Sequence, residues 1–448
     1  MNTSILQLKN KNQLLTRLAQ SRSVTDDLFR IVRADALYER PIPERHRIVF
    51  YIGHLEAFDW NLIAGQALGI GSRHKELDHI FAFGIDPVGA GLPQDKPSDW
   101  PRLSEVSAYN RRVREEIDDL LASHLQVSRN NWRYPKKVIL NVAIEHRLMH
   151  AETLTYMLHQ LTSERKVAPA SYSSISQQTA LSVAHRMIDI PAGIATLGMS
   201  QQDESFGWDN EFEEFSVEVP AFAIAAHKVT NGEFLRFVSE GGYNDQRFWS
   251  VADWAWINGN RIAHPHLWFK RRNQWFYRAM FEELPLPLAW PVYVSHAEAA
   301  AYARFAGMSL PTEAQFHRAA YGTPEKFEAL QRAYPWGDAP HDLTRGNFGF
   351  ERWDPVAVGS YPAGRSAFGL EDTLGNGWEW TATYFAPHPG FESFPFYRGY
   401  SANFFDKNHF VVKGASPRTA ACLLRRSFRN WFQPHYPYVY ASFRCVSN

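Results

Sequence analysis

The chain has 448 residues, more than an ordinary single domain, so the length predicts two domains. Basic and acidic residues balance at 47 each, which argues against a general nucleic-acid or anionic-membrane surface. The opening residues contain no long apolar run, so we expect neither a secretory signal nor a transmembrane helix. Two cysteines, Cys422 and Cys445, cannot build a disulfide framework, and the simplest expectation is a soluble cytoplasmic protein.

The first 161 residues predict four helices joined by long connections, an arrangement typical of a bundle whose interior can hold a metal. The first is an arm in two pieces, with Ser23 or Thr25 as the cap of the second piece. The third opens at Ser104 as its cap. Residues 70–102, rich in Gly, Pro and Asp, are expected to form a loop. The predicted helical ranges are 12–21 with 25–38, 44–68, 104–125 and 136–161.

The last of these helices carries His146 and His150, four residues apart. At that spacing both imidazoles project from one face of the helix and offer two metal ligands. The Glu of the zinc-protease HExxH motif is missing, because the order is His-Arg-Leu-Met-His. Histidine pairs at this spacing also occur without a metal, so a third ligand is needed to support the site.

His54, in the second predicted helix, is the candidate third ligand because it lies within an apolar run and is expected to point inward. The structural alternative is a core histidine bonded to a backbone group. Three imidazoles would leave coordination positions open, which suits catalysis better than structure. Glu56, Asp59 and Glu152 could replace one ligand or bond a ligand's second nitrogen.

Residues 162–187 are polar and Ser-rich and predict the connection between the domains. From residue 188 to 448 short segments are broken by Gly, Pro and Asn, which predicts a loop-rich α+β domain. Its expected helices are 231–242, a second capped by Ser295 and ending at Gly307, and a third capped by Thr312 after Pro311.

Specific motifs of this region appear in the order found in the formylglycine-generating-enzyme (sulfatase-modifying factor) domain, which the chain resembles over nearly all of 188–448. They are IPAG, PVYVSHAEAAAYARFAGMSLPTEAQFHRAA, YPWGD, LGNGWEWTATYF and SFRCV. The helical region with its three histidines is similar to the DinB-type metal-binding domain. The resemblance therefore implies a DinB-like four-helix bundle (1–161), a linker (162–187) and a C-type-lectin-like α+β domain (188–448).

This pair of domains resembles the ergothioneine-biosynthetic sulfoxide synthase family. The resemblance implies an iron(II) ion on His54, His146 and His150, which uses O2 to couple a donor to C2 of the imidazole of hercynine (Nα-trimethylhistidine). It also implies that Asn430 and Trp431 contact hercynine, and we expect hercynine at the junction of the domains. The segments GHLEAFDWN and FAFGIDPV look more like the family's selenoneine synthase branch.

Two departures from the family pattern bear on the substrates. Met149 stands where the family helix usually has a polar residue, so one of the family's contacts to hercynine is not expected at this position. Phe432 stands where some members carry an acidic residue. From Phe432 we expect a neutral selenosugar or thiosugar donor, with γ-glutamylcysteine or cysteine as the alternative. Arg111, with its neighbour Arg112, and Arg114 could bind the carboxylate of such an amino-acid donor; the structural alternative is a solvated charged face.

A trimethylammonium group cannot donate a classical hydrogen bond and is held by aromatic faces and nearby carboxylates. The C-terminal region supplies many aromatic side chains. The structural alternative for each of them is a place in the hydrophobic core. We expect Trp380 and Tyr438 among the hercynine contacts, and one of Tyr384, Tyr397 and Tyr400 as a proton donor to oxygen. The full aromatic set is Trp378, Trp380, Tyr384, Phe385, Trp431, Tyr436, Tyr438 and Tyr440.

Other functions remain as alternatives. A copper-dependent formylglycine-generating activity needs a close cysteine pair, whereas Cys422 and Cys445 are 23 positions apart. A zinc-dependent thiol transferase on the bundle, and a non-enzymatic ligand-binding protein with structural histidines, stay open. Related domains also suggest a structural Ca²⁺ ion held by Asn376 and Glu379.

Overall fold

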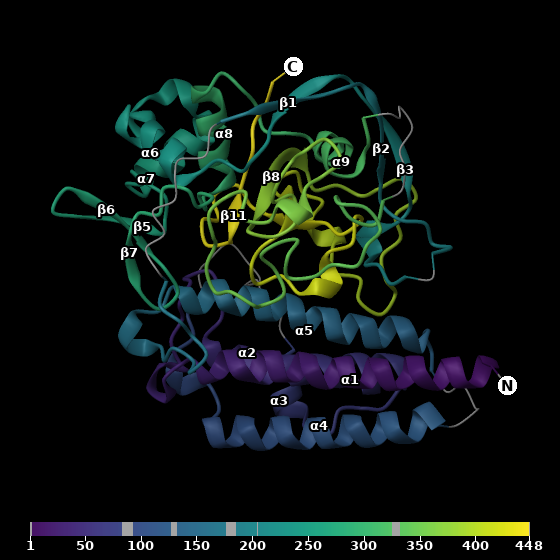
Figure 1. Cartoon of the computed structure of the whole chain (residues 1–448). Helices are drawn as coiled ribbons and strands as arrows, with labels where there is room; N and C mark the ends of the chain where they lie inside the picture. Colours follow the sequence, from purple (N-terminus) through teal and green to yellow (C-terminus); the bar gives the residue numbers. More distant parts are fainter. Residues whose placement is uncertain are drawn as a thin grey trace. The chain divides into compact units, whose positions relative to one another are not determined.

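A computed structural model describes residues 2–82, 93–126, 132–175, 185–203, 205–324 and 332–447 (Figure 1). The chain divides into two compact units, Met1–Tyr172 and Ser173–Asn448. The division falls inside the stretch expected to link the domains, part of which (176–184) lies outside the described residues. The segment FAFGIDPV also lies largely outside them. Within the described residues, no helix combines the length and apolarity needed to cross a membrane.

Long helices build the N-terminal unit, and α1 packs on α5 while α2 packs on α4 (Figure 1). At the end of α2 the chain continues as a π-helical segment, in which Leu68 N donates to Ile63 O at 3.2 Å. Apolar residues of α1, α2, α4, α5 and the π-helical segment are buried, among them Phe50, Ile117 and Leu154. The elements are α1 (Asn2–Arg30), α2 (Ile48–Asp59), the π-helical η2 (Trp60–Ala67), α3 (Lys75–Ile80), α4 (Leu103–Gln126) and α5 (Lys136–His159).

The structure corrects three expectations for this unit. The opening arm is one continuous helix, because the hydroxyl of Thr25 donates to the carbonyl oxygens of Ser21 and Arg22 inside α1 instead of capping a new piece. Helix α4 begins at Leu103, so Ser104 lies within its first turn and does not cap it. The stretch 70–102 contains the short helix α3 as well as loop.

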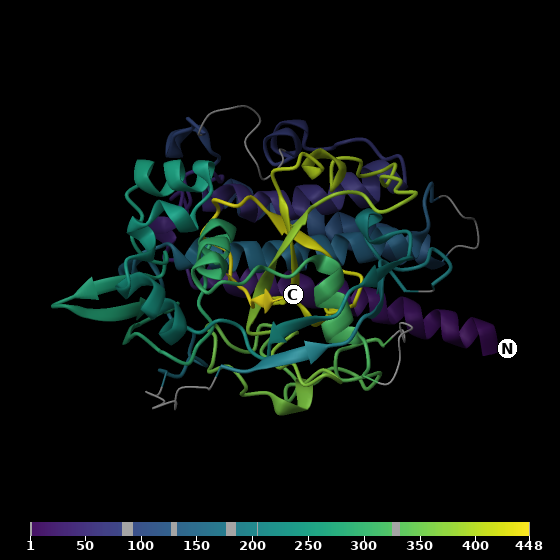
Figure 2. The same ribbon diagram turned by 90° about the horizontal axis from the view of Figure 1, so that it is seen from above.

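In the C-terminal unit, the residues that the structure describes form small separate sheets joined by loops and short helices (Figure 2). The central sheet has the order β10-β9-β8-β11, and β11 pairs with β8 in parallel. Its strands are β8 (Gly377–Tyr384), β9 (Phe410–Ala415), β10 (Asn430–Phe432) and β11 (Ala441–Ser442).

Among the described residues, the further strands form three smaller sheets. One has the order β1-β4-β12, one is the pair β2-β3, and one is β5-β6-β7. Their strands are β1 (Met187–Ile190), β2 (Gly193–Leu197), β3 (Phe215–Val219), β4 (Phe222–Ala225), β5 (Trp268–Arg271), β6 (Gln274–Arg278), β7 (Glu283–Pro285) and β12 (Val446–Ser447).

The predicted helices of this unit are confirmed with their caps. Ser295 Oγ accepts from Glu298 N at 3.2 Å, and Thr312 Oγ1 accepts from Gln315 N at 3.1 Å, each within a capping box. A further short helix, α7, was not expected from the sequence. The helices are α6 (Asn231–Ser239), α7 (Val251–Gly259), α8 (His296–Phe305) and α9 (Glu313–Tyr321).

Strand β8 organises the core of the C-terminal unit. Gly375, Asn376 and Gly377 all have positive φ and turn the chain into the strand. From Gly377 to Thr381 every residue of β8 is buried. The Trp380 indole is fully buried and donates from Nε1 to Val294 O at 2.9 Å. The buried strand fixes β9, and β9 in turn carries β10 at the edge of the sheet.

Candidate active site

Three buried histidines of the N-terminal unit converge: His54 from α2, and His146 and His150 from α5. The nitrogen atoms they can offer all lie within 4.8 Å of one another. The Nε2 atoms of His146 and His150 are 3.1 Å apart. Two metal–nitrogen bonds of about 2.1 Å at right angles would separate their nitrogens by about 3.0 Å. That separation also fits a hydrogen bond between two neutral rings, so the third histidine carries the argument.

His54 is oriented by a backbone carbonyl, because its Nδ1 lies 2.7 Å from Phe81 O and donates to it. Its Nε2 is then the atom that could bind a metal, and this buried atom has no hydrogen-bond partner among the described residues. Gly53 permits the arrangement, since an added Cβ would lie 2.4 Å from the Phe81 ring. A buried nitrogen without a partner costs free energy unless something binds it, which favours a metal over the core-histidine alternative.

Aromatic rings flank the histidines. Phe58 stacks on His146 with centroids 3.4 Å apart, and Phe50 stacks on His54 at 4.9 Å. Burial lowers the pKa of His54 to about 4. Burial, reinforced by the neighbouring histidines, also holds the pKa of His146 and His150 well below the ordinary value. All three imidazoles are therefore neutral near pH 7, the state that binds a metal.

A buried ion cluster ties the two histidine-bearing helices together. Arg147 of α5 donates from Nη2 to Glu56 Oε2 at 2.9 Å and to Asp59 Oδ2 at 2.7 Å, both on α2. Burial alone would raise the pKa of Glu56, but Arg147 and Arg114 bring it to about 2. Glu56 and Asp59 therefore bind arginine, and the suggestion that they replace a metal ligand is wrong. Glu152 is buried but is not part of the histidine group.

The arginines of α4 separate into two kinds. Arg114 donates from Nη1 and Nη2 to the two oxygens of Asp26, each at 2.8 Å, and from Nη2 to Glu56 at 2.6 Å. Its guanidinium is thus engaged within the bundle. Arg111 and Arg112 are exposed, as the charged-face alternative expects.

In the C-terminal unit, Trp431 of β10 lies in an aromatic group that we call the Trp431 cluster: Trp431, Phe385, Phe404, Tyr400 and Trp208. Phe385 stacks on Trp431 with centroids 4.0 Å apart and an interplanar angle of 7°. Tyr400 and Phe404 lie 5.5 and 5.6 Å from it. Trp208 stacks on Tyr400 at 3.9 Å. Rings in several orientations around one half-buried indole are the kind of surface that attracts an organic cation.

Asn430 and Phe432 flank Trp431 on the same strand, so their side chains alternate with it across the sheet. Asn430 Oδ1 accepts from Trp431 N at 2.9 Å, which leaves the Nδ2 amino group as its route to a ligand. Phe432 stacks with Tyr436 at 6.1 Å, and Tyr436 in turn contacts Tyr438 at 5.0 Å. Because β10 is an edge strand, a ligand could reach both faces only around that edge.

The three candidate tyrosines are placed differently. Tyr400 contacts Trp431 directly, and Tyr397 lies 5.6 Å from Tyr400. Tyr384 is 49% exposed and packs on Phe410 instead. Burial raises the pKa of Tyr397, which keeps its hydroxyl protonated. Trp380, expected among the substrate contacts, is a fully buried core residue.

The contacts of Asn376 and Glu379 do not favour the expected calcium site. Glu379 accepts from Lys228 Nζ at 2.8 Å and from Arg444 Nε at 2.5 Å, and all three side chains are fully buried. Asn376 Oδ1 accepts from Val356 N and Asn347 Nδ2. The oxygens that would bind Ca²⁺ are thus engaged by protein donors, and two cationic side chains already neutralise the carboxylate.

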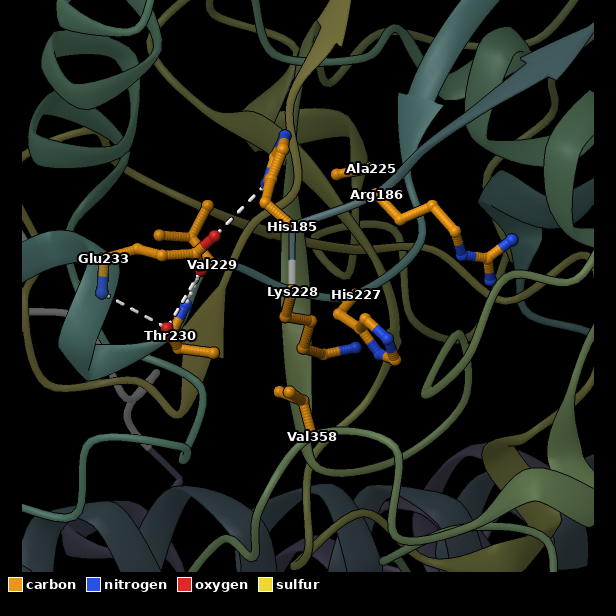
Figure 3. A pocket seen from close by; sticks show the side chains of 9 residues that line it. All are labelled: His185, Arg186, Ala225, His227, Lys228, Val229, Thr230, Glu233 and Val358. Atoms are coloured by element: carbon orange, nitrogen blue, oxygen red, sulfur yellow. Dashed lines mark hydrogen bonds and ion pairs between the residues drawn. The ribbon is translucent and has the colours of Figure 1, made fainter. Parts of the chain in front are cut away.

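Figure 3 shows a pocket of the C-terminal unit that contains no expected site residue. Within the lining, His185 Nδ1 lies 3.1 Å from Glu233 Oε1 (Figure 3). The Lys228 ammonium is held by Glu379, a residue outside the lining. We assign no ligand to it. The lining residues are His185, Arg186, Ala225, His227, Lys228, Val229, Thr230, Glu233 and Val358.

Sequence reasoning missed Arg147, Phe58, Trp208 and Phe404. Phe58 lies four residues after His54, so helical spacing could have indicated its place beside the histidines. Arg147 adjoins His146, and its partners Glu56 and Asp59 had already been considered as carboxylates near the histidines. Trp208 and Phe404 are far from Trp431 in sequence, and no local pattern would have grouped them.

Comparison with known proteins yields one family model and several relatives. The sulfatase-modifying factor enzyme 1-like domain family matches residues 172–448. The hercynine oxygenase of Mycolicibacterium smegmatis is 34% identical over 437 residues, covering 95% of this chain and 96% of that protein. The hercynine oxygenase of Mycolicibacterium thermoresistibile is 39% identical over 254 residues, 55% of each chain.

A fungal relative is similar to most of the chain as well. Ergothioneine biosynthesis protein 1 of Neurospora crassa is 27% identical over 498 residues, which cover 92% of this chain and 55% of that protein. The alignments thus span about half the length of the M. thermoresistibile and N. crassa proteins and nearly all of the M. smegmatis protein.

Proposed function

The chain belongs to the hercynine oxygenase family, the ergothioneine-biosynthetic sulfoxide synthases, and from this premise we propose that it is an iron(II)- and O2-dependent enzyme acting on hercynine. The reaction removes the hydrogen from C2 of the hercynine imidazole and the hydrogen from the S–H or Se–H group of the donor. One C–S or C–Se bond forms, one oxygen atom of O2 is added to the sulfur or selenium, and the other leaves as water.

The observation that carries the proposal is the converging histidine group. The ion would be held by the Nε2 atoms of His54, His146 and His150. The hydrogen bond from His54 Nδ1 to Phe81 O leaves His54 Nε2 for the ion, and the Nε2 atoms of His146 and His150 lie 3.1 Å apart. Neutral imidazoles suit Fe(II), and three of them leave positions for substrate and oxygen. A bound iron(II) ion would supply the electron transfer to O2 that no side chain of this group can provide.

Hercynine recognition is proposed for the Trp431 cluster. Its rings offer faces to the trimethylammonium group, whose positive charge cannot donate a classical hydrogen bond. Asn430 can donate from Nδ2 to an acceptor of the same ligand. Among the candidate proton donors we favour Tyr400, because it contacts Trp431 and the exposed Tyr384 does not.

For the donor we propose a neutral selenosugar or thiosugar. Phe432 with Tyr436 and Tyr438 forms an aromatic, hydroxyl-bearing surface suited to packing on a sugar. An amino-acid donor would bring a carboxylate whose burial needs a cation. Arg114 is already engaged by Asp26 and Glu56, although Arg111 remains exposed. The second candidate donor, γ-glutamylcysteine or cysteine, is supported by the ergothioneine-biosynthetic relatives.

The decisive assay supplies iron-loaded protein with hercynine and O2 and one donor at a time: cysteine, γ-glutamylcysteine, a thiosugar or a selenosugar. Products are identified by mass spectrometry and rates by O2 uptake. We expect the greatest kcat/KM with a sugar donor. A greater kcat/KM for γ-glutamylcysteine, lost in Arg111→Ala, would make the chain an ergothioneine enzyme. Tight zinc with no O2 uptake would favour a thiol transferase.

A further inference from the structure

The ring of Trp431 is linked through Phe385 to a buried charge. Phe385 is 1% exposed and stacks on Trp431 with a 7° interplanar angle. The guanidinium carbon of Arg429 lies over the same Phe385 ring at 5.0 Å. Arg429 also directly precedes Asn430 on the chain. The position of this guanidinium therefore affects the orientation of both Asn430 and Trp431, the residues that we assign to hercynine.

Arg429 is itself held by a two-pronged ion pair. Its Nε and Nη2 atoms donate to the two oxygens of Glu313 at 3.1 and 3.2 Å, and both side chains are nearly fully buried. Its Nη1 donates to Ala386 O at 3.0 Å, beside Phe385. Glu313 is the first residue of α9, and its backbone N donates to Thr383 Oγ1 at 2.9 Å. The planar guanidinium is thus fixed in one orientation by partners from different elements.

We propose that Glu313 and Arg429 are positioning residues that set the orientation of Trp431, through Phe385, for binding of hercynine. This inference rests on the proposed function. A buried ion pair adds little net stability compared with apolar packing of the same volume, so stability alone does not account for it. The fixed guanidinium of Arg429 holds the Phe385 ring, and the Phe385 ring in turn holds the orientation of Trp431. The part of the Trp431 ring that Phe385 does not cover stays available to a cation.

The alternative is that the pair only holds the fold together. A matched buried pair in the same unit separates the two roles: Arg444 binds Glu379 with Nε and Nη2, again in a two-pronged arrangement. Glu379 lies on β8. The ring contacts that the structure describes for the Trp431 cluster do not include Glu379. Glu313→Gln and Glu379→Gln remove the same charge from equally buried sites.

The experiment compares steady-state kinetics of the parent, Glu313→Gln, Arg429→Lys and Glu379→Gln holoenzymes. Glu313→Gln should raise the KM for hercynine about tenfold with kcat changed by less than about twofold, because binding geometry is lost and the chemistry is not. Arg429→Lys keeps the positive charge but loses the two-pronged guanidinium contact, so it should raise the KM for hercynine as Glu313→Gln does. Glu313→Asp keeps the carboxylate and should raise this KM less than Glu313→Gln. Glu379→Gln should be less stable yet keep the parent KM.

A double-mutant cycle shows whether the effect passes through Trp431. In Trp431→Phe protein, adding Glu313→Gln should raise the KM for hercynine by much less than it does in the parent. Equal factors in both backgrounds would overturn the inference. So would a KM unchanged in Glu313→Gln, or raised equally in Glu379→Gln.

A ligand-independent measurement keeps this inference distinct from the proposed function. In 5-fluorotryptophan-labelled protein, Trp431→Phe identifies the ¹⁹F resonance of Trp431. That resonance should shift in Glu313→Gln and stay in place in Glu379→Gln. If it shifts but the parent does not bind hercynine, the proposed function fails while the positioning of Trp431 stands. If the parent binds hercynine and the resonance does not shift, the positioning inference alone fails.

Discussion

The histidine group of the N-terminal unit and the Glu379 cluster of the C-terminal unit are both buried and polar, yet only one can accept a metal ion. Around Glu379, the cations Lys228 and Arg444 occupy the carboxylate oxygens. Around His54, the charged partners lie elsewhere: Arg147 binds Glu56 and Asp59, and the Nε2 atom of His54 is left without a partner among the described residues.

The difference follows from the cost of burying charge. A buried carboxylate must be paired, so a core that holds one without a metal must supply a cation of its own. A neutral imidazole carries no such requirement and can keep a lone pair directed at an empty position. The contrast predicts where metals, charge removal and pH should affect this protein.

The largest effect is expected from the histidines. His54→Ala, His146→Ala and His150→Ala should each lower iron content to a small fraction and activity by more than about 100-fold, since each supplies one metal-binding nitrogen. Elemental analysis after anaerobic purification measures the iron, and far-ultraviolet circular dichroism checks the fold. Unchanged iron in all three variants would exclude this site.

Removing a cation from the buried cluster should cost the most stability. Arg147→Met leaves Glu56 and Asp59 in the core without that partner and should lower the free energy of unfolding by about 3–5 kcal/mol. The exposed pair of Arg165 and Asp35 is the control, and Arg165→Met should cost about 0–1 kcal/mol. Urea unfolding of the metal-free protein measures both. Equal costs would show that the Arg147 cluster does not hold α2 against α5.

An acid in the C-terminal unit should make stability depend on pH. Burial raises the pKa of Asp209 to about 6, and its Oδ1 accepts from Ser401 Oγ at 2.7 Å. The folded chain therefore binds this proton more tightly than the unfolded chain, so the contribution of Asp209 to stability is greatest below about pH 4 and falls as pH rises through about 6. From the ordinary value of 3.8 the loss is at most about 3 kcal/mol.

Urea unfolding of the parent and of Asp209→Asn between pH 4 and 7 isolates this contribution. Asp209→Asn should remove the part of the decline in unfolding free energy with rising pH that Asp209 causes. Ser401→Ala removes a hydrogen bond to the charged form and should steepen the decline. Parallel profiles for the parent and Asp209→Asn would contradict the assignment.

The smallest effect is expected from calcium. Because Lys228 and Arg444 already neutralise Glu379, adding Ca²⁺ or removing it with a calcium-selective chelator should shift the melting temperature by less than about 1 °C. Differential scanning calorimetry of the iron-loaded protein measures this. A rise in melting temperature that grows with Ca²⁺ concentration and disappears in Asn376→Ala would show that the ion binds there after all.

How much the sequence alone could predict depended on the range of the interaction. Helix α5, the i, i+4 pairing of His146 and His150, and the caps Ser295 and Thr312 follow from local spacing and were anticipated. The continuity of α1 through Thr25 was missed, because a buried threonine that bonds back to its own helix has the same sequence signature as a cap.

Long-range pairing could not be predicted in the same way. Nothing near Glu379 in sequence reveals that Lys228 and Arg444 will meet it in the core, so a carboxylate in a familiar motif resembled a calcium ligand. The aromatic residues of the C-terminal unit posed the same difficulty. Trp380 and Trp431 both stand in aromatic-rich segments, so the sequence does not distinguish their roles. The sheet order places Trp380 in the core and Trp431 on an edge strand.

We propose that this histidine group binds the iron ion used for oxygen-dependent chemistry on hercynine. The most direct test is to incubate anaerobically purified, iron-loaded protein with hercynine, a selenosugar or thiosugar, and O2, and to follow the product by mass spectrometry. We predict one iron ion per chain and a product joined at C2, both lost in His54→Ala. Full product formation by His54→Ala, or by protein that contains zinc and no iron, would contradict the account.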